Sequence, residues 1–443
     1  MKPVRAYTFQ GKAIVFVLHS LLALVSLITG RRWKRPVKGF SENSLRFSLT
    51  DVLYLSYKYY YAAITEWDTP ESSSKINRTF SPPHVPDGAP EITLTAGGDL
   101  MPYNWIQKPF SRHLWDDIGT DFFASDLVFA NLETPVDPEQ DKGFVPEVML
   151  NHMEFNGTEE MLDIFNGNGH YKGFDVFSTA NNHSYDKGEQ GIINTIRLLE
   201  RNGIKYCGTA VSADEVMNFP IIEKNGIRVA FIGASYSLNH LTLPKGKEYL
   251  CNHIEVHWPD CDLSLLKQQT EHAYAQDADV VVASLHYGNA YQLFPSDHVI
   301  DVTHRIFNEC GVDVIIGNHA HNLQPHEFYE FTCPIKKTRK TGYAAYALGD
   351  FVAYDIFTWG HLPIYVKLTL AKTGDGVVIK NVTVNPVYTY GHYIDENNRD
   401  LRFLDARKLW SDAEQGKYPT FFTNEHKKEL GHLKEIFRKV YPE

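Results

Sequence analysis

The sequence predicts an α/β protein with buried strands that alternate with helices. From Glu91 onward, short apolar runs rich in β-branched and aromatic residues end abruptly in polar clusters, as "FDVFSTANNH" does at His183. Amphipathic stretches lie between some of these runs. "EQGIINTIRLLERNG" has apolar residues at helical spacing before a stop at Gly203, and "HVIDVTHRIFNECG" repeats this pattern before Gly311. Together, these two patterns indicate sheets with helices packed outside them.

Length and composition set the broad class. The chain has 443 residues, 43% of them hydrophobic and 22% charged, which is enough for one large domain or two ordinary ones. Its net charge of −11 argues against a general nucleic-acid binder, but an anionic substrate stays compatible because bound cations reverse a local field. The five cysteines are scattered and odd in number, which indicates no disulfide framework and favours a reducing compartment.

Residues 1–38 are predicted to form an N-terminal membrane anchor with basic flanks. Ala13–Gly30 contains no charged residue, and its eighteen residues reach the length of a single-pass helix. A cleaved signal peptide and a buried helix are the alternatives. Three basic residues precede the segment and five follow it, so the charge count slightly favours a cytoplasmic main domain; they are Lys2, Arg5 and Lys12, then Arg31, Arg32, Lys34, Arg35 and Lys38.

Residues 39–90 are predicted to be an amphipathic segment followed by a linker. Asp51–Trp67 is aromatic and apolar, and two interpretations remain equal: a membrane-interface segment, or an amphipathic helix that packs on the main domain. Ser81–Pro90 contains four prolines and a glycine, which is typical of a linker. We expect the main domain to span 91–390 and a helical appendage to span 391–443.

Polar side chains follow the predicted strands of the main domain at the points where the strands end. In open α/β sheets, ligands bind beyond the carboxyl ends of the strands, so we expect these side chains to form one site. They are Asp99, Asn131, Glu133, Asn182, His183, His286, His319, His321 and Asp350.

These residue types indicate a metal centre. Carboxylates, amides and imidazoles without cysteine suit Zn, Mn, Fe or Mg. His319 and His321 stand two residues apart in "GNHAH", and on an extended strand or its continuing loop they would share a face. A lone His-x-His pair is more often part of a surface loop, but the other strand-end ligands favour the metal interpretation.

Six motifs resemble, in order, those of the CapA family of capsule and poly-γ-glutamate synthesis, whose fold belongs to the calcineurin-like metallophosphoesterases. The resemblance covers roughly residues 91–355 and implies two β-sheets packed face to face with helices outside. The motifs are "GGDLM", "NLETP", "ANNHSYDKGEQGI", "SLHYG", "GNHAHNLQPHE" and "ALGDF".

The resemblance also implies roles for individual residues around one or two divalent ions. Glu133 would take the place of a bridging aspartate, with Asn182, His286 and His319 completing that metal site. Asp99 and His321 would hold the second metal. His183 would be a catalytic histidine outside the ligand shell. Asp186 would orient His183 or its loop, or would simply begin the following helix; both interpretations stay open.

Three positions depart from the family pattern. Met101 stands where superfamily members have a histidine, Asn104 stands where the family has an arginine, and Asp350 is an added carboxylate that would otherwise be a loop cap. The sequence therefore supports two hypotheses. One is a membrane-anchored, metal-dependent hydrolase of a phosphoester or anionic polymer, working with other capsule or polyglutamate synthesis subunits. The other is a non-catalytic polymer-binding or assembly component with the same fold. The family role implies an outward-facing domain, although the charge count points inward.

Overall fold

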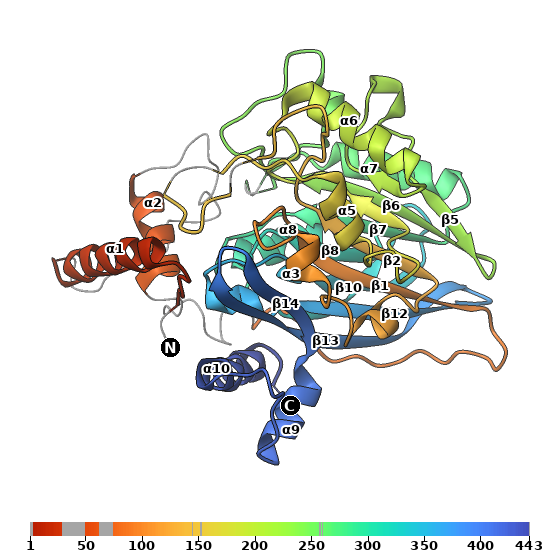
Figure 1. The fold of residues 1–443 in the computed structure, drawn as a ribbon. Coiled ribbons are helices and arrows are strands. Elements are labelled where there is room, and N and C mark those ends of the chain that lie inside the picture. The colour runs from red at the N-terminus through yellow and green to blue at the C-terminus, as the bar shows by residue number, and fades with distance from the viewer. Residues whose placement is uncertain are drawn as a thin grey trace.

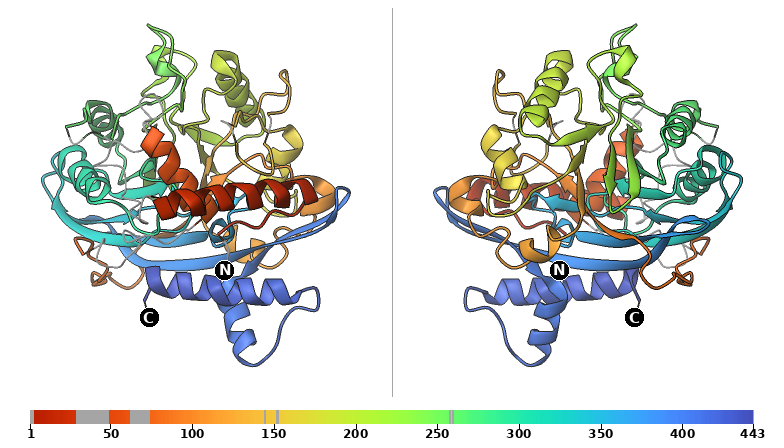
Figure 2. Two further views of the ribbon diagram at one scale, coloured as in Figure 1. Left: turned by 90° about the vertical axis from the view of Figure 1, so that its left-hand side faces the viewer. Right: turned by 90° about the vertical axis from the view of Figure 1, so that its right-hand side faces the viewer.

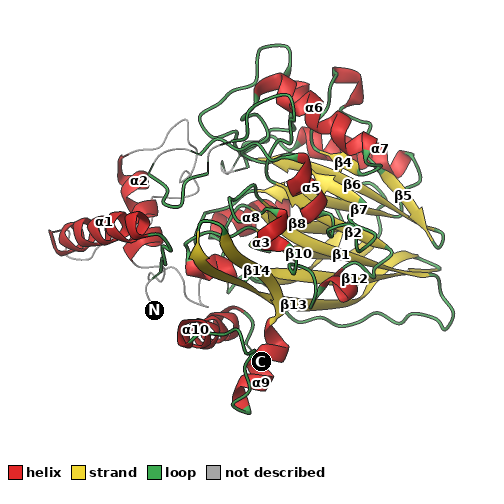
Figure 3. Cartoon of the chain, viewed as in Figure 1, coloured by secondary structure: helices red, strands yellow, loops and turns green. Residues whose placement is uncertain are grey.

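The computed structural model describes residues 3–28, 49–61, 74–143, 145–150, 153–256, 258 and 260–442. Two β-sheets pack face to face at the centre of the described structure, with helices outside the strands (Figures 1 and 3). Phe129 of one sheet stacks on Phe231 of the other with ring centroids 5.6 Å apart. The predicted α/β fold with two sheets and flanking helices is therefore confirmed.

The first sheet has eight strands in the order β14-β13-β12-β1-β2-β3-β4, and β11 pairs with β1 beside this path. The run from β1 to β4 is parallel, whereas β12, β13 and β14 are antiparallel. The strands are β1 (Glu91–Leu100), β2 (Leu127–Leu132), β3 (Val176–Ser178), β4 (Lys205–Cys207), β11 (Asp350–Val352), β12 (Ile364–Thr373), β13 (Gly376–Asp395) and β14 (Asn398–Asp405).

The second sheet has six strands in the order β5-β6-β7-β8-β10-β9, and its central pairs β6–β7, β7–β8 and β8–β10 are parallel. The central strands β7 and β8 are buried along their whole length, as expected for parallel strands that are covered on both faces. The strands are β5 (Ile221–Lys224), β6 (Ile227–Ser235), β7 (Val280–His286), β8 (Val314–Asn318), β9 (His326–Thr332) and β10 (Arg339–Ala345).

Helices connect many of the strands and cover the outer faces. The predicted helix after "STANNHSYDKG" is α6 (Gly188–Arg201), which buries its apolar stripe. The helix predicted after β7 is α8 (Asp297–Arg305), and its π-helical last turn, Ile306–Cys310, stops at Gly311 because that residue takes a left-handed φ of 77°. The other helices of this region are α3 (Lys108–Ser111), α4 (Gly119–Phe122), α5 (Glu159–Phe165) and α7 (Ser264–Ala275).

The C-terminal residues continue the first sheet. The boundary predicted at residue 390 falls inside β13, because this long strand pairs with β14 as far as Asp395. The last helices, α9 (Ala406–Glu414) and α10 (Asn424–Val440), then pack beside β13 and bury Leu409 and Leu433 in the main core (Figure 2). The helical appendage thus begins about fifteen residues later than predicted and shares the core of the domain.

The aromatic segment predicted at Asp51–Trp67 packs on the main domain where it is described. It forms α2 (Leu49–Ser56) and a π-helical turn, η2 (Tyr57–Tyr61). Tyr54, Lys58, Tyr59 and Tyr60 are buried, which favours the packing interpretation over a free interfacial segment. Trp67 lies outside the described residues.

The N-terminal residues before the first helix bind the main domain. The amide of Arg5 donates to the carbonyl of Ile356 at 2.7 Å, and the carbonyl of Pro3 accepts from the amide of Thr358 at 2.9 Å. Helix α1 (Phe9–Ile28) then begins, and it is long and apolar enough to cross a membrane by length and composition. All five cysteines are free and buried, in line with the absence of a predicted disulfide framework.

Arg5 also makes a long-range ion pair that predicts a stability effect. Its guanidinium lies 2.6 Å from the buried carboxylate of Glu429, which His361 also contacts at 2.6 Å. Burial alone would raise the pKa of Glu429, but His361 and Arg5 hold this pKa below its ordinary value. We expect Arg5→Met to lower stability by about 1–3 kcal/mol, because the buried carboxylate of Glu429 loses the guanidinium that pairs with it.

The matched control is Arg402→Met. Arg402 has a side-chain exposure of 26%, close to the 25% of Arg5, but it pairs locally with Asp400. Such a surface pair contributes at most about 1 kcal/mol. Chemical denaturation of the two variants compares them, and equal losses would contradict a structural role for the N-terminal residues.

Candidate metal centre

The site forms where the strand ends of the two sheets meet. In the first sheet, Asp99 near the end of β1 lies in register with Asp350 of β11 and Asn131 of β2. In the second sheet, His286 ends β7 in register with Asn318, the last residue of β8. The strand ends predicted from sequence to share one site therefore do lie together.

Glycines allow the first sheet to make this approach. A Cβ on Gly98 would lie 2.1 Å from the carbonyl oxygen of Gly349, the residue before β11. Only glycine at 98 lets β1 and β11 come this close. This contact brings the carboxylates of Asp99 and Asp350 side by side.

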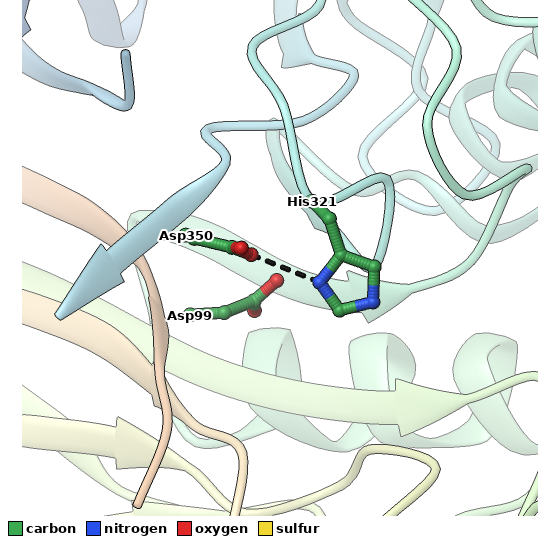
Figure 4. Close-up of side chains that lie close together, drawn as sticks. All are labelled: Asp99, His321 and Asp350. Carbon is green, nitrogen blue, oxygen red and sulfur yellow. Dashed lines mark hydrogen bonds and ion pairs between the residues drawn. The ribbon is translucent and has the colours of Figure 1, made fainter. Parts of the chain in front are cut away.

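Two groups of potential metal ligands share one carboxylate. Asp99, Glu133 and His286 have ligand atoms that all lie within 4.8 Å of one another, and so do Asp99, His321 and Asp350 (Figure 4). We call these the first and second donor groups. Asp99 belongs to both groups, whereas Glu133, for which the family resemblance implied a bridging place, belongs to the first group alone. Asp350, expected as an added carboxylate or a loop cap, is a full member of the second group.

Distances within the groups are close to those of direct contacts. His286 Nε2 lies 3.5 Å from Glu133 Oε1, and its Nδ1 lies 3.9 Å from Asp99 Oδ1. His321 Nδ1 lies 2.9 Å from Asp350 Oδ1. His319 Nδ1 lies 3.2 Å from His286 Nε2, which places His319 at the first group.

Burial makes the charge of these groups costly. It raises the pKa of Asp99 to about 6 and also raises the pKa of Asp350. Burial raises the pKa of Glu133 well above its ordinary value, and the nearby charge of Asp99 raises it further. Burial also lowers the pKa of His286 well below its usual range, with His319 and His321 adding to this. Burial therefore drives these carboxyl groups toward their protonated forms and His286 toward its neutral form.

His321 behaves differently from His286. Burial alone would lower its pKa, but the neighbouring Asp350, Glu133 and Asp99 carboxylates raise it to about 10. A protonated His321 therefore partly compensates the acids of the second group. Binding of a divalent cation would displace this proton, because imidazole ligates metals in its neutral form.

Several buried ligand atoms have no hydrogen-bond partner among the described residues: both carboxylate oxygens of Glu133, Oδ2 of Asp350 and Oδ1 of Asn182. Buried oxygens without donors are rare in folded proteins. All of them are oxygens, in a cluster of carboxylates and imidazoles. The residues present therefore fit divalent cations of the Mn, Zn, Fe or Mg class.

The two histidines of "GNHAH" do not share a face as strand neighbours do. β8 ends at Asn318, and both His319 and His321 take left-handed backbone conformations, with φ of 85° and 58°. These uncommon conformations turn His319 toward His286 and His321 toward Asp350. The shared-face expectation was therefore wrong in its geometry, although both imidazoles reach the cluster.

Asn131 and Tyr236 were not assigned roles from sequence. Asn131 Nδ2 donates to Asp99 Oδ1 at 2.7 Å and lies 3.3 Å from His286 Nδ1, so it fixes the shared carboxylate. Tyr236 Oη lies 3.0 Å from His319 Nε2. In the sequence, the position of Asn131 at a strand end was the one sign of a functional role. No sequence pattern around Tyr236 indicated a role for it.

The two asparagines of the "STANNHSYDKG" loop make different contacts. Asn181 donates to the carbonyl of Leu132 at 2.8 Å and so ties the loop to β2. Asn182 Nδ2 donates to Asn239 at 3.0 Å, which leaves the amide oxygen of Asn182 as the atom available to a metal.

His183 is held on two sides. Its Nδ1 lies 2.6 Å from Asp186 Oδ2, and its ring stacks on Phe155 with centroids 3.8 Å apart. The same Asp186 oxygen accepts from the amide of Phe155 at 2.7 Å. The residue before α6 is Lys187, without a side-chain cap, so Asp186 orients His183 and does not cap the helix.

Met101 does not take part in the cluster. It is fully buried in the apolar core cluster that also contains Leu100 and Tyr103. The first strand therefore provides a carboxylate but no imidazole, and Asp350 is the ligand that completes the second donor group.

The part of the chain that carries the donor groups is similar in sequence to known proteins. A family model described as "Bacterial capsule synthesis protein PGA_cap" matches residues 93–355, which include every strand that carries a donor group. The chain is 26% identical over 275 residues to "Capsule biosynthesis protein CapA" of Bacillus anthracis, covering 59% of this chain and 60% of the relative. It is also 26% identical over 288 residues to "PGA biosynthesis protein CapA" of Bacillus subtilis strain 168, covering 63% and 68%.

Two solved structures align over most of their length at low similarity. The calcineurin-like phosphoesterase YfkN from Bacillus subtilis aligns at 14% identity with a TM-score of 0.37, covering 78% of this chain and 99% of that one. A hypothetical protein from Thermus thermophilus aligns at 13% identity with a TM-score of 0.35, covering 67% and 98%.

The shared Asp99 predicts an asymmetry between carboxylate variants. We expect the parent chain to bind about two equivalents of Mn²⁺. Asp99→Asn should abolish binding at both groups, whereas Asp350→Asn should leave the first group occupied. Calorimetric titration of the metal-free chain measures both stoichiometries.

The control is Asp355→Asn. Asp355 is a buried carboxylate nearby, but it accepts hydrogen bonds from Tyr59 and Tyr103 and lies outside both donor groups. This variant should keep the parent stoichiometry. Equal losses in the Asp99 and Asp350 variants would contradict the shared-ligand arrangement.

The raised pKa of Asp99 predicts how metal binding depends on pH. In the metal-free protein, burial favours the protonated form of Asp99 more than the unfolded chain does. Protonated Asp99 therefore contributes to the free energy of unfolding in full below the pKa that Asp99 has in the unfolded chain, and this contribution is lost as pH rises through about 6. Metal requires the ionised form, so affinity should be greatest above pH 7. It should fall at least about tenfold per pH unit below 6, since protons compete with the metal.

Thermal denaturation with and without Mn²⁺ from about pH 5 to 8 measures this linkage. The metal-induced rise in Tm should shrink as pH falls. A constant rise across this range would show that the buried carboxylates do not bind the metal.

Proposed function

The chain belongs to the family of bacterial capsule synthesis proteins, and from this premise we propose that it is a metal-dependent phosphoesterase-type hydrolase of capsule or poly-γ-glutamate biosynthesis. The observation that carries the proposal is the pair of donor groups joined by Asp99. Two ligand sets with one common carboxylate are the arrangement that a two-metal hydrolytic site requires. The substrate class is a phosphoester or an anionic polymer, and other synthesis subunits are the expected partners.

The first metal would be held by Asp99, Glu133 and His286, with Asn182 and His319 as further ligands. The second would be held by Asp99, His321 and Asp350. Bound divalent cations supply activation of water and compensation of charge on phosphoryl oxygens. The protein residues hold the ligand atoms rigidly, because Asn131 fixes Asp99 and Tyr236 fixes His319.

His183 is the proposed proton donor. Asp186 as a carboxylate can only accept a hydrogen bond, so His183 Nδ1 is the donor in this contact. His183 Nε2 donates a proton to the leaving oxygen from the doubly protonated imidazole, and the ring is then left neutral. Stacking on Phe155 limits the orientation of the ring. The pair therefore positions an imidazole that delivers a proton to the leaving oxygen and stabilises charge that develops there.

An alternative is a polymer-binding or assembly component without hydrolytic activity. The burial of Met101 in the apolar core favours it, because the second donor group has one imidazole where phosphoesterases commonly have two. Under this alternative the protein would hold metal but would turn over no ester. The same assays therefore separate the two functions.

We expect His183→Ala to reduce kcat for a phosphodiester or phosphomonoester by about 10²–10⁴-fold with unchanged metal content, because the general acid is lost. Asp186→Asn should reduce kcat by about 10–100-fold, because it acts through His183. It should also alter the pH profile, since the imidazole loses its carboxylate partner.

The matched control is His304→Ala. His304 also pairs with a buried carboxylate, Glu327 at 2.9 Å, but belongs to neither donor group. This variant should keep parental activity. Full metal occupancy with no turnover in the parent chain would support the assembly role, and activity unaffected by His183→Ala would overturn the proposed acid.

A further inference from the structure

Helix α1 has an exposed apolar face. Of the ten large apolar side chains that are exposed in the described part of the chain, seven lie on this helix. They recur at helical spacing and form one stripe along its full length. We call them the α1 face: Phe9, Phe16, Val17, Leu21, Leu24, Leu27 and Ile28.

Few polar side chains interrupt this face. Ser20 lies within the stripe, and its hydroxyl donates to the carbonyl of Phe16 at 2.8 Å. Gln10 and Lys12 are exposed in the first turn, where their polar ends can reach headgroups, and no charged residue follows Lys12 before the end at Ile28. The rest of the α1 face can therefore enter an apolar medium without leaving a polar group unpaired.

The other side of α1 packs on the protein. Val15 and Leu22 are buried in the main core cluster together with Tyr59 and Tyr60 of η2. His19, near the middle of the helix, contacts the ring of Tyr61 at 5.1 Å. A helix that crosses a bilayer alone would be surrounded by lipid, whereas α1 has one protein-covered side and one exposed apolar side.

Both flanks of α1 bind the same loop of the main domain. On the N-terminal side, the amide of Arg5 donates to Ile356, and Glu147 accepts hydrogen bonds from the amides of Tyr7 and Thr8. On the C-terminal side, the hydroxyl of Tyr59 donates to Asp355, the residue directly before Ile356. A spanning helix of this length would separate its flanks by about 30 Å, on opposite sides of the membrane.

The sequence between α1 and α2 does not allow a return crossing. Residues 29–48 contain Arg31, Arg32, Lys34, Arg35 and Lys38, and each such charge is costly in the hydrocarbon core. Since both flanks bind the domain, α1 must stay on one side of the membrane.

We propose that α1 lies flat on a lipid bilayer as an in-plane anchor, with the α1 face immersed at the boundary between headgroups and acyl chains. A helix with one polar or covered side and one wholly apolar side binds membranes in this way. The occupant is an anionic lipid surface, because Lys12 and the five basic residues that follow α1 complement acidic headgroups. This mode replaces the single-pass crossing expected from the sequence.

Vesicle flotation of the purified full chain tests the lipid-binding face. We expect flotation with phosphatidylcholine vesicles that contain phosphatidylglycerol, and weaker flotation with phosphatidylcholine alone. Leu21→Asp combined with Leu24→Asp should reduce binding at least about tenfold, since two charges enter the apolar boundary. Both side chains are 55% exposed, so the fold tolerates the change.

The matched control is Ile394→Asp. Ile394 is 67% exposed, like Leu27, but lies near the β13–β14 turn. This variant should float as the parent chain does. Unchanged flotation of the double variant would overturn the proposal, and so would self-association through α1 without vesicle binding.

Cysteine labelling distinguishes an in-plane helix from a crossing one. The five native cysteines are buried, so Lys12→Cys, Val52→Cys and Glu396→Cys provide separate exposed reporters. Lys12 lies beside the α1 face and not on it, so a membrane-impermeant maleimide should reach all three from the same side in intact cells and inverted vesicles. Labelling of Lys12→Cys and Val52→Cys from opposite sides would overturn the proposal, and so would proteolytic cleavage of α1 from the membrane-bound chain. Neither result depends on hydrolytic activity.

Discussion

The buried carboxylate of Asp99 is the constraint on which the functional site depends. It lies at the junction of the two sheets, belongs to both donor groups, and accepts hydrogen bonds from Asn131 and from the amide of His319. Burial of Asp99, Glu133 and Asp350 together costs free energy unless cations offset it. A divalent metal bound at the cluster would offset this cost, and this is the physical basis of the proposed metal site.

The N-terminal residues contact parts of the main domain that are distant in the sequence. Arg5 reaches the buried Glu429 of α10, and Tyr59 reaches Asp355, so segments at the two ends of the sequence meet around one loop. The same loop follows β11, the strand that carries Asp350. The anchor region is therefore a structural part of the domain that holds the metal site, and its removal would disturb more than attachment to a surface.

Local patterns in the sequence predicted much of this structure. The apolar runs, the α6 and α8 periodicities and the ordered motifs led to the fold and to most of the ligand set. What they missed depends on tertiary contacts. Asp350 joins Asp99 because β11 pairs with β1 across a long separation in the sequence. His319 contacts His286 while His321 contacts Asp350, and both residues take left-handed conformations. The tethering of Pro3 and Arg5 carries no local signal, since it depends on Thr358 and Ile356, which lie more than 300 positions away.

The position of the anchor relative to the site has a consequence for access. His321 stacks on Tyr291 at 5.4 Å, and Tyr291 meets Tyr59 edge to face at 5.0 Å, which connects the second donor group to the turn that supports α1. An anchor that lies flat on a bilayer would hold this side of the metal site next to the lipid surface. A substrate attached to, or emerging from, that surface would then reach the site without leaving the membrane. A single-pass tether followed by a flexible linker would place no such restriction on the orientation of the domain.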